Sequence, residues 1–380
     1  MSDAQKQSKL YQNLNINFDA QDIESVVKSF NSISFSGKSP IISEYEGVIG
    51  KYFNIEHAIA CCNGTVAIEL ALRGVGVQAG GRVALPPTAP IMTILPIITM
   101  GCTPVFCDVA KDGFGPDIAD LEILLKEGID ALITVPMWGY PFDPKPVVDL
   151  CRRYGVPIVE DCAHSFGTEV HGKKLGTFGD AAAFSTHERK LVSTGEGGFC
   201  LTPRRDVYER MRSWQQHGLA MSRNDGSYTL GEGVGTNYKL SPLCAALGIS
   251  QFSKLDRKIA ARRERIQALR AKLGELHTIR EFARTNGEEI NGYAMVFWGP
   301  EDTPIRAKKL GAHNILSDTT RYSYKPLYQE PAFKSYARVC PNGERMINSI
   351  FTLPCHEGLE ECDLDYIAST AKEVFEATAI

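Results

Sequence analysis

The sequence lacks an apolar segment that could cross a membrane as a helix. Its most apolar window, residues 83–100, is interrupted by four prolines, which prevent a continuous helix (Pro86, Pro87, Pro90 and Pro96). The first 17 residues are polar and lack the apolar core of a signal peptide. We therefore expect a soluble, cytoplasmic protein with no membrane partner.

The chain also lacks a large excess of either charge. It has 41 Lys and Arg against 45 Asp and Glu, a formal net charge of -4, which argues against a nucleic-acid partner bound through its phosphates. The eleven cysteines include no Cys-x-x-Cys pair, and the eight histidines include no His-x-x-His pair. We therefore expect free, buried thiols in a reducing compartment and no metal site.

What the sequence does contain is a regular alternation of short apolar runs and helical segments. The predicted strands are residues 58–61, 82–85, 103–108, 131–135 and 158–161, and the helices between them are 67–73, 92–100, 118–126 and 147–154. Such alternation predicts an α/β fold with a mainly parallel central sheet covered by helices on both faces. Ligands of these sheets bind at the carboxyl ends of the strands.

The flanking regions have a different pattern. Residues 19–30 and 40–52 are predicted helices, and the first of them begins at Asp19. Apolar residues from Leu243 to Leu273 predict one long helix that connects two domains. Because 380 residues are many for one domain, we expect a large domain at 1–250, with an N-terminal helical segment, and a smaller α+β domain at 251–380 that begins in the connecting helix.

The candidate chemistry is concentrated in residues 160–198. Lys190 lies among small and apolar residues, five positions after the hydroxyl of Ser185 and before the glycine-rich segment 195–198, and Asp161 ends an apolar run. A lysine can form a Schiff base with an aldehyde and can also move protons. A carboxylate can keep a pyridine nitrogen protonated. These residues are the parts that a pyridoxal phosphate enzyme needs, although a surface lysine and an ordinary strand-end acid stay open as alternatives.

Four motifs in this stretch resemble one enzyme family. They are Glu160-Asp161-x-Ala163-x-x-x-Gly167, Gly176-x-x-Gly179-Asp180, Phe184-Ser185-x-His187-x-x-Lys190 and Gly195-Glu196-Gly197-Gly198. In this order they resemble the DegT/DnrJ/EryC1/StrS family of sugar aminotransferases, and residues 353–367 extend the resemblance over nearly the whole chain. The resemblance implies a fold-type I, pyridoxal-phosphate-dependent enzyme. Such an enzyme transfers an amino group from Glu or Gln to a keto sugar, usually nucleotide-linked, or to a keto cyclitol.

The resemblance also implies roles around the cofactor ring. Lys190 matches the Schiff-base lysine, and Asp161 matches the partner of the pyridine nitrogen. His164 stands where many members carry Gln, near the phenolic oxygen of the cofactor, and neutral histidine can donate there too. A core histidine without a ligand is the alternative.

The phosphate and the substrates have their own candidates. Gly64 and Thr65 lie at a strand-to-helix turn and match the phosphate site, to which Ser185 adds its hydroxyl. Asn237 matches a segment that reaches the phosphate from the other subunit, which implies a homodimer with shared active sites. The candidate substrate-binding residues are His217, Arg321 and Tyr324, which match segments of the family, although a structural turn explains the segment around His217 equally well.

Four positions depart from the family pattern. Pro90 replaces the aromatic residue that stacks on the pyridine ring, and Trp138 falls in Pro136-Met137-Trp138-Gly139 where His-x-Tyr-Gly is expected. Lys239 replaces a common Arg, and Tyr328 replaces a common His. We interpret these changes as intact cofactor binding with altered substrate contacts, hence an unusual acceptor.

Two other functions fit the same scaffold. A cofactor-dependent sugar dehydratase is one, but such relatives carry His in place of the lysine, so Lys190 favours transamination. A regulatory homologue that binds the cofactor without amino transfer is the other.

Overall fold

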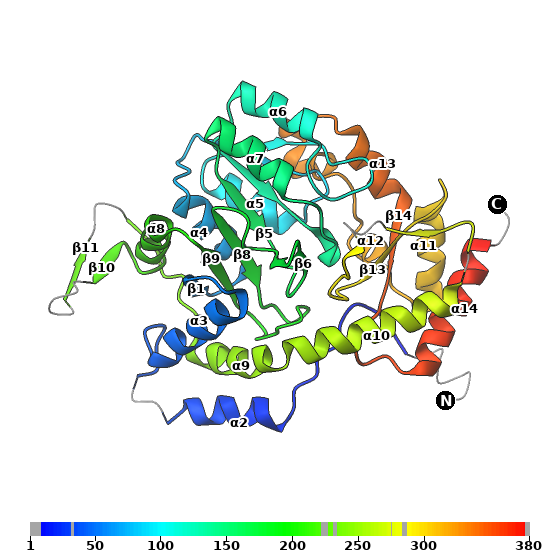
Figure 1. The fold of residues 1–380 in the computed structure, drawn as a ribbon, viewed down its shortest axis with the longest axis horizontal. Coiled ribbons are helices and arrows are strands. Elements are labelled where there is room, and N and C mark those ends of the chain that lie inside the picture. Colours follow the sequence, from blue (N-terminus) through cyan, green and yellow to red (C-terminus); the bar gives the residue numbers. More distant parts are fainter. Residues whose placement is uncertain are drawn as a thin grey trace.

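Two β-sheets organise the chain (Figure 1). The computed structural model describes residues 9–31, 34–221, 227–230, 234–274, 276–282 and 287–376. The larger sheet lies between residues 57 and 202, and a three-stranded sheet lies between residues 280 and 353. None of the helices in these described ranges is long and apolar enough to span a membrane.

The large sheet is mostly parallel, as the sequence predicts. Its strands are β1 (His57–Cys61), β2 (Arg82–Leu85), β3 (Thr103–Phe106), β4 (Ala131–Thr134), β5 (Ile158–Asp161), β8 (Ala181–Ser185) and β9 (Gly198–Thr202). They are arranged in the order β1-β9-β8-β5-β4-β2-β3, and only β9 runs antiparallel to its neighbours. The carboxyl ends of the other six strands therefore lie at one edge, which is where α/β sheets bind ligands.

Helices cover both faces of this sheet (Figure 1). They are α4 (Gly64–Gly74), α5 (Ile91–Thr99), α6 (Ile118–Glu127), α7 (Lys145–Tyr154) and α8 (Arg205–Gln215). Because side chains alternate along a strand, Leu132 packs with α6 and α7 while its neighbour Ile133 belongs to the larger core that includes α4. The five predicted strands and four predicted helices are thus confirmed, with ends that shift by up to three residues.

The predicted connecting helix is interrupted, and the prediction of one continuous helix is wrong. The structure has α9 (Pro242–Ser253) and α10 (Leu255–Leu273), separated at Lys254, whose φ of -105° and ψ of -6° depart from helical values. The Lys254 ammonium is buried and pairs with Asp19 at 2.5 Å and Asp22 at 2.8 Å. The two carboxylates offset the desolvation of the buried ammonium at this junction between α9 and α10. An apolar periodicity alone does not reveal such a break.

The N-terminal helices are confirmed as α2 (Ala20–Ser29) and α3 (Pro40–Phe53). Asp19 caps α2, and its side chain and that of Asp22 each accept a hydrogen bond from the other residue's backbone N–H. This helix buries polar Asp22, whereas Ile23, Val27 and Phe30 are 63%, 58% and 61% exposed. An apolar face is thereby left uncovered within one chain.

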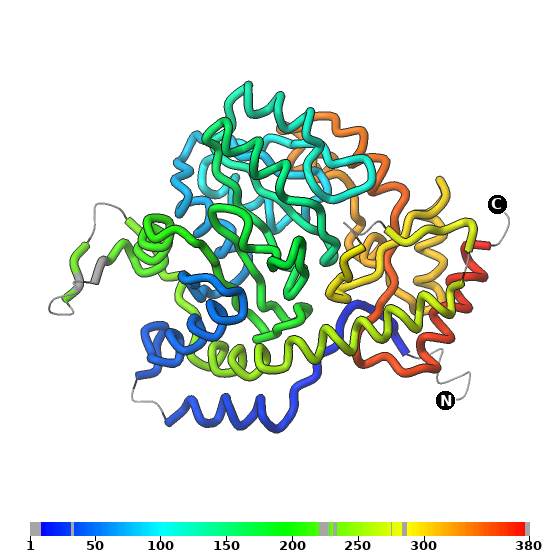
Figure 2. The backbone as a smooth tube through the Cα atoms, viewed as in Figure 1, coloured from blue at the N-terminus to red at the C-terminus, as the bar shows by residue number. Residues whose placement is uncertain are grey.

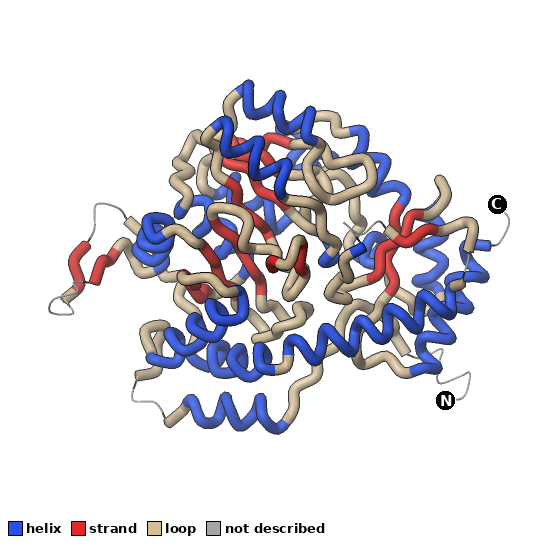
Figure 3. Tube along the Cα trace, viewed as in Figure 1, coloured by secondary structure: helices blue, strands red, loops and turns tan. Residues whose placement is uncertain are grey.

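The C-terminal part is a smaller α+β unit. Its antiparallel strands are β12 (Arg280–Glu281), β13 (Met295–Trp298) and β14 (Ile350–Leu353), drawn in red in Figure 3. Its helices are α11 (Thr303–Ala312), α12 (Asp318–Arg321), α13 (Pro341–Ser349) and α14 (Glu361–Glu376), with α14 packed along α10. Figure 2 shows the blue N-terminal segment reaching this unit, where Tyr11 exchanges backbone hydrogen bonds with Asn314 and Leu316, each 2.8 Å long.

Short elements complete the fold. They are β6 (Glu169–Val170), β7 (Lys173–Lys174), β10 (Leu219–Met221), β11 (Tyr228–Leu230) and the 3-10 turns η1 (Met137–Gly139), η3 (Leu327–Gln329) and η4 (Pro331–Tyr336). β10 and β11 form a hairpin that projects from the body of the molecule in Figure 1.

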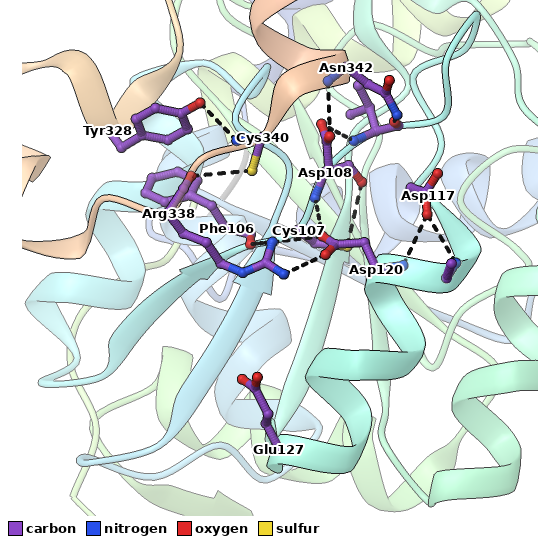
Figure 4. Close-up of polar contacts among 12 residues, drawn as sticks. Phe106, Cys107, Asp108, Asp117, Asp120, Glu127, Tyr328, Arg338, Cys340 and Asn342 are labelled. Carbon is purple, nitrogen blue, oxygen red and sulfur yellow. Dashed lines mark hydrogen bonds and ion pairs between the residues drawn. The ribbon is translucent and has the colours of Figure 1, made fainter.

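Two carboxylates attach the C-terminal part to the edge of the large sheet (Figure 4). Asp108, just after β3, accepts hydrogen bonds from the amides of Asn342 (3.0 Å) and Gly343 (2.9 Å) in the first turn of α13. A carboxylate is stabilised at a helix N-terminus. Asp120 of α6 pairs with the guanidinium of Arg338. The segment around residues 338–343 is therefore fixed beside the strand ends where ligands bind.

Candidate active site

Lys190 lies in the loop that joins β8 to β9. Residues 186–197 form this loop, and it is closed by a hydrogen bond from the Thr186 N–H to the Gly197 carbonyl (2.9 Å). The hydroxyls of Thr186 and Thr194, 2.6 Å apart, close it further. The loop begins at the carboxyl end of β8. Lys190 is therefore held at the edge of the sheet by a loop whose two ends are hydrogen-bonded to each other.

The amine of Lys190 is in a poorly solvated position. Its Nζ lies 5.3 Å from the ring centroid of Tyr293. Burial lowers the pKa of Lys190 from 10.5 to about 8, while the Asp161 carboxylate opposes that change. At pH 7 roughly one amine in ten is then neutral, compared with about one in three thousand for an ordinary lysine. Lys190 can therefore serve as a nucleophile and as a base.

Asp161 is a buried carboxylate at the end of β5. It accepts a 2.6 Å hydrogen bond from the hydroxyl of Thr93 and a 3.2 Å bond from the amide of Ala163. Burial raises the pKa of Asp161, against the effect of these donors and of Lys190. A bound cation, such as a protonated ring nitrogen, would stabilise its ionised form. Thr93 lies in an apolar window and belongs to no recognisable motif, so the sequence alone does not reveal it.

His164 is a neutral donor that shares the ring of Tyr293 with the Lys190 amine. Its ring stacks on Tyr293, with centroids 4.0 Å apart, and its Nδ1 accepts a 3.3 Å hydrogen bond from the Trp138 amide. Burial, with the charges of Lys190 and Arg189, lowers the pKa of His164 well below its usual value. Since Nδ1 accepts, the proton is on Nε2, which is left as the donor.

The backbone of the His164 loop is held from the C-terminal part of the chain. Asn291 is fully buried, and its amide donates to the carbonyls of His164 (2.8 Å) and Phe166 (3.0 Å). Asn291 lies 127 residues after His164, so no local motif could have identified it.

The start of α4 has the geometry to bind an anion. Asn63 caps this helix, and Gly64 and Thr65 are its first two residues, so their amides have no acceptor within the helix. A Cβ on Gly64 would lie 2.6 Å from the Cβ of Ser185, and one on Gly198 would lie 2.7 Å from the Asn63 carbonyl. The two glycines therefore let the β1–α4 turn approach the ends of β8 and β9. The resulting cradle brings two amides and a hydroxyl together.

These groups match the three functional parts of pyridoxal phosphate. An aldehyde needs an amine such as Lys190, a basic ring nitrogen needs a carboxylate such as Asp161, and a phosphate suits the helix start at Gly64. The residues present could therefore hold this cofactor. Within the described ranges, no group of three His, Cys, Asp or Glu side chains could hold a metal ion.

The predicted substrate residues lie at different distances from this cluster. Tyr324 packs edge-on against Trp138, with centroids 5.3 Å apart, and its hydroxyl donates to the Thr88 carbonyl. Arg321 is exposed and donates to the side chain of Gln12. Tyr324 thus contacts Trp138 in the wall of the site, while Arg321 is exposed and its charge is one of those that act on the Asp318 carboxylate.

His217 and Asn237 form a separate, exposed group with Lys239. The Lys239 ammonium lies 3.2 Å from His217 Nε2 and donates to the Asn237 side chain. Among the residues that the structure describes, no hydrogen bond or ion pair joins this group to Lys190. Lys239 forms a β-bridge with Cys61 at the end of β1, two residues before the turn at Asn63, so this group lies on the phosphate side of the site and not at Lys190. The role of Asn237 in a partner's site stays a prediction.

Two departures from the family pattern have structural roles. Pro90 is the N-cap of α5, and its carbonyl accepts a 3.0 Å hydrogen bond from the Thr93 amide. Pro90 therefore helps to position Thr93, whose hydroxyl donates to Asp161. Tyr328 packs edge-on against Phe106 and donates to Glu344 at 2.6 Å. Tyr328 is therefore part of the attachment of the C-terminal segment shown in Figure 4.

Known proteins share both the sequence and the fold. GDP-perosamine synthase of Caulobacter vibrioides is 28% identical over 94% of this chain and 96% of its own. The dTDP-4-amino-4,6-dideoxy-D-glucose transaminase of Shigella dysenteriae is 25% identical, over 90% of this chain and 92% of its own. The pyridoxal-phosphate form of the sugar aminotransferase Spr1654 from Streptococcus pneumoniae superimposes with a TM-score of 0.88 at 22% identity, covering 98% of this chain and all of its own.

The fold-type I architecture predicted from the sequence is thus confirmed by the solved structure. The sequence profile of the DegT/DnrJ/EryC1/StrS aminotransferase family, whose members depend on pyridoxal phosphate, matches residues 17–372. This match includes every residue of the cluster around Lys190. The chain belongs to the DegT/DnrJ/EryC1/StrS family and is an aminotransferase.

Proposed function

We propose that this enzyme uses pyridoxal phosphate to transfer an amino group from glutamate or glutamine to a keto sugar carried on a nucleotide, or to a keto cyclitol. The observation that supports this most is the placement of the Lys190 amine 5.3 Å from the ring centroid of Tyr293, the same ring on which His164 stacks, where burial lowers the pKa of Lys190 to about 8 and Asp161 opposes that change. The names of the two relatives, which refer to GDP- and dTDP-linked amino sugars, favour a nucleotide-linked acceptor.

In this proposal the cofactor is held at three points. The amides of Gly64 and Thr65 and the hydroxyl of Ser185 bind its phosphate. Asp161 binds the protonated ring nitrogen, and Nε2 of His164 donates to the phenolic oxygen. Each contact pairs a charge or lone pair with a group that is already in position, which reduces the cost of ordering on binding.

When bound, the cofactor supplies an electron-accepting ring and the carbon on which the amino group is carried. Lys190 Nζ attaches the cofactor and removes the proton from the substrate carbon. Thr93 keeps Asp161 oriented by its 2.6 Å hydrogen bond. The backbone N–H of Trp138 donates to Nδ1 of His164. Since a backbone N–H can only donate, this bond fixes the His164 tautomer in which Nε2 carries the proton.

We further propose a homodimer with shared active sites. The uncovered apolar face of α2, formed by Ile23, Val27 and Phe30, supports a protein partner surface. If Asn237 completes the partner's site, co-expression of Lys190→Ala with Asn237→Ala restores activity, because a mixed dimer contains one site without either change. If each variant is inactive alone and the co-expressed pair is also inactive, although light scattering shows that it forms a dimer, the shared site is contradicted.

The division into domains at residues 250 and 251 is likewise a proposal. The break at Lys254 between α9 and α10 supports a boundary near that point. Limited proteolysis that first cleaves near residues 253–255 agrees with it.

The direct test is an absorption spectrum of the purified protein before and after glutamate, with Lys190→Ala in parallel. We expect a visible band that glutamate bleaches, and a mass increase at Lys190 after borohydride reduction. A protein that takes up no cofactor contradicts the site, and a band that neither glutamate nor glutamine bleaches contradicts the donors. The bleached enzyme is then offered keto sugars, and recovery of the band identifies the acceptor.

A further inference from the structure

A charge pair beside Lys190 is buried but poorly bonded. The side chains of Arg189 and Asp318 are only 11% and 6% exposed, yet Arg189 Nη2 and Asp318 Oδ1 are 3.7 Å apart. That distance is too long for a hydrogen bond. Buried ion pairs stabilise a protein only when good geometry and further hydrogen bonds offset their desolvation, so this pair is incomplete as it stands.

The missing partners can be specified atom by atom. Asp318 Oδ2 accepts hydrogen bonds from the Asn13 amide group (2.9 Å) and the Trp138 indole (3.1 Å), but Oδ1 has no donor within the described part of the chain. Asn13 Oδ1, also buried, has no donor there either. Within the described residues, the Arg189 guanidinium donates one long hydrogen bond of 3.3 Å, to the Asn13 carbonyl, and its central carbon lies 5.7 Å from the ring centroid of Tyr322. Two buried acceptors are therefore left without a donor at one place, beside a cation that makes one long hydrogen bond and a contact with an aromatic ring.

This place adjoins the candidate active site. Arg189 precedes Lys190 in the chain, and the Asp318 carboxylate is one of the charges that act on the Lys190 amine. Trp138 connects the two groups directly, because its indole donates to Asp318 while its backbone N–H donates to His164.

The chemistry of the gap selects one kind of ligand group. A carboxylate would satisfy Arg189 but would be repelled by Asp318, and an ammonium would do the reverse. A hydroxyl accepts from the guanidinium and donates to the carboxylate at the same time. Oδ1 has no exposed surface, so the hydroxyl reaches it only when the weakly held guanidinium moves aside.

We propose that Arg189, Asp318 and Asn13 form a subsite that binds a ring hydroxyl of the sugar or cyclitol acceptor. The hydroxyl accepts from Arg189 and donates to Asp318 Oδ1. The inference rests on the proposed acceptor class, and it makes Asp318 a specificity-determining residue for the sugar half of the reaction. A site built to bond a hydroxyl discriminates strongly against a ligand that lacks it, because its buried polar groups are then left unpaired.

The test uses dTDP-4-amino-4,6-dideoxy-D-glucose and GDP-perosamine, the compounds in the names of the two relatives, together with their 2-deoxy and 3-deoxy analogues. Binding to the cofactor-free protein is measured by calorimetry, and bleaching of the cofactor band by each amino sugar is measured in the loaded enzyme. The variants are Asp318→Asn and Arg189→Gln, with Asp149→Asn, an exposed change on α7, as the matched control.

We expect removal of one of the two hydroxyls to weaken binding to the unchanged protein at least tenfold, but to weaken binding to Asp318→Asn less than threefold. Both variants should impair the sugar reaction at least ten times more than the glutamate reaction. Should Asp318→Asn fail to fold, Arg189→Gln carries the same comparison. Asp149→Asn should match the unchanged protein throughout.

Three outcomes overturn the subsite. In the first, the unchanged protein and the variants lose affinity equally when either hydroxyl is removed. In the second, the variants slow the glutamate reaction as much as the sugar reaction, which would make the pair a positioning element for Lys190. In the third, the unchanged protein binds a sugar but loses no affinity when either hydroxyl is removed, which overturns the subsite while the proposed amino transfer stands.

Discussion

Replacing Lys190 with methionine should stabilise the cofactor-free protein at neutral pH. The native state lowers the pKa of Lys190 from 10.5 to about 8, mainly by desolvation, so protonation of this amine opposes folding. One pKa unit corresponds to about 1.4 kcal/mol, so the cost reaches about 3 kcal/mol. It is fully present below pH 8 and disappears as the pH rises towards 10.5. Methionine has a similar length and no charge, and it avoids this cost.

Differential scanning calorimetry of the cofactor-free protein measures the effect. With an unfolding entropy of about 2.1 cal/mol/K per residue, 380 residues give about 0.8 kcal/mol/K, so Lys190→Met should raise Tm by about 4 °C at pH 7. The gain should shrink steadily between pH 8 and pH 10. Lys51→Met, on an exposed position of α3, is the matched control and should change Tm by less than 1 °C. A Lys190→Met protein that is no more stable at pH 7, or whose gain is independent of pH, would refute the proposed desolvation of the amine.

Other substitutions test how the site is held. Gly64→Ala places a methyl group 2.6 Å from the Cβ of Ser185, and a fluorescence titration should show at least tenfold weaker cofactor binding with an unchanged circular dichroism spectrum; equal affinity would exclude the cradle. Thr93→Val removes the 2.6 Å bond to Asp161 and should weaken cofactor binding about tenfold, since bonds to charged groups contribute about 1.5–3 kcal/mol, whereas Thr93→Ser should retain it. Asn291→Ala removes three hydrogen bonds, two to the carbonyls of His164 and Phe166 and one from the Tyr293 amide, and should lower stability by about 2–3 kcal/mol in urea unfolding; a loss below 0.5 kcal/mol would show that the loop needs no such support.

The predictable part of the site is local in sequence. Asp161, Ser185 and Lys190 lie within 30 residues of one another, and each follows or ends a strand whose apolar pattern is visible in the chain. The strand-to-helix turn at Gly64 is recognisable for the same reason, because a cap, a glycine and a helical segment follow one another directly. The structure adds that these residues lie together at one edge of the sheet. A parallel sheet predicts the edge at which they lie, but not which of them are neighbours.

The unpredicted part depends on contacts between distant segments. Asp318 meets Asn13 across 305 residues and Trp138 across 180, and the sequence around each contains no motif for such a contact. The break at Lys254 depends on Asp19 and Asp22 in another helix. Charge pairs between remote positions cannot be deduced from one sequence, because each acidic residue has many basic residues in the chain with which it could pair.

The sequence by itself determined the order of strands and helices and the mainly parallel sheet, and it singled out Lys190 and Asp161 as the candidate lysine and carboxylate of the site. It could do so because hydrophobic periodicity and glycine-rich turns act over short stretches of chain. Only the tertiary structure decided which side chains share the site, such as Thr93 on Asp161 and Asp318 beside Arg189. It also decided that α2 buries its polar face and leaves its apolar face uncovered. Burial and desolvation depend on the packing of the whole chain, and they set both the pKa of Lys190 and the unsatisfied oxygens of the proposed hydroxyl subsite.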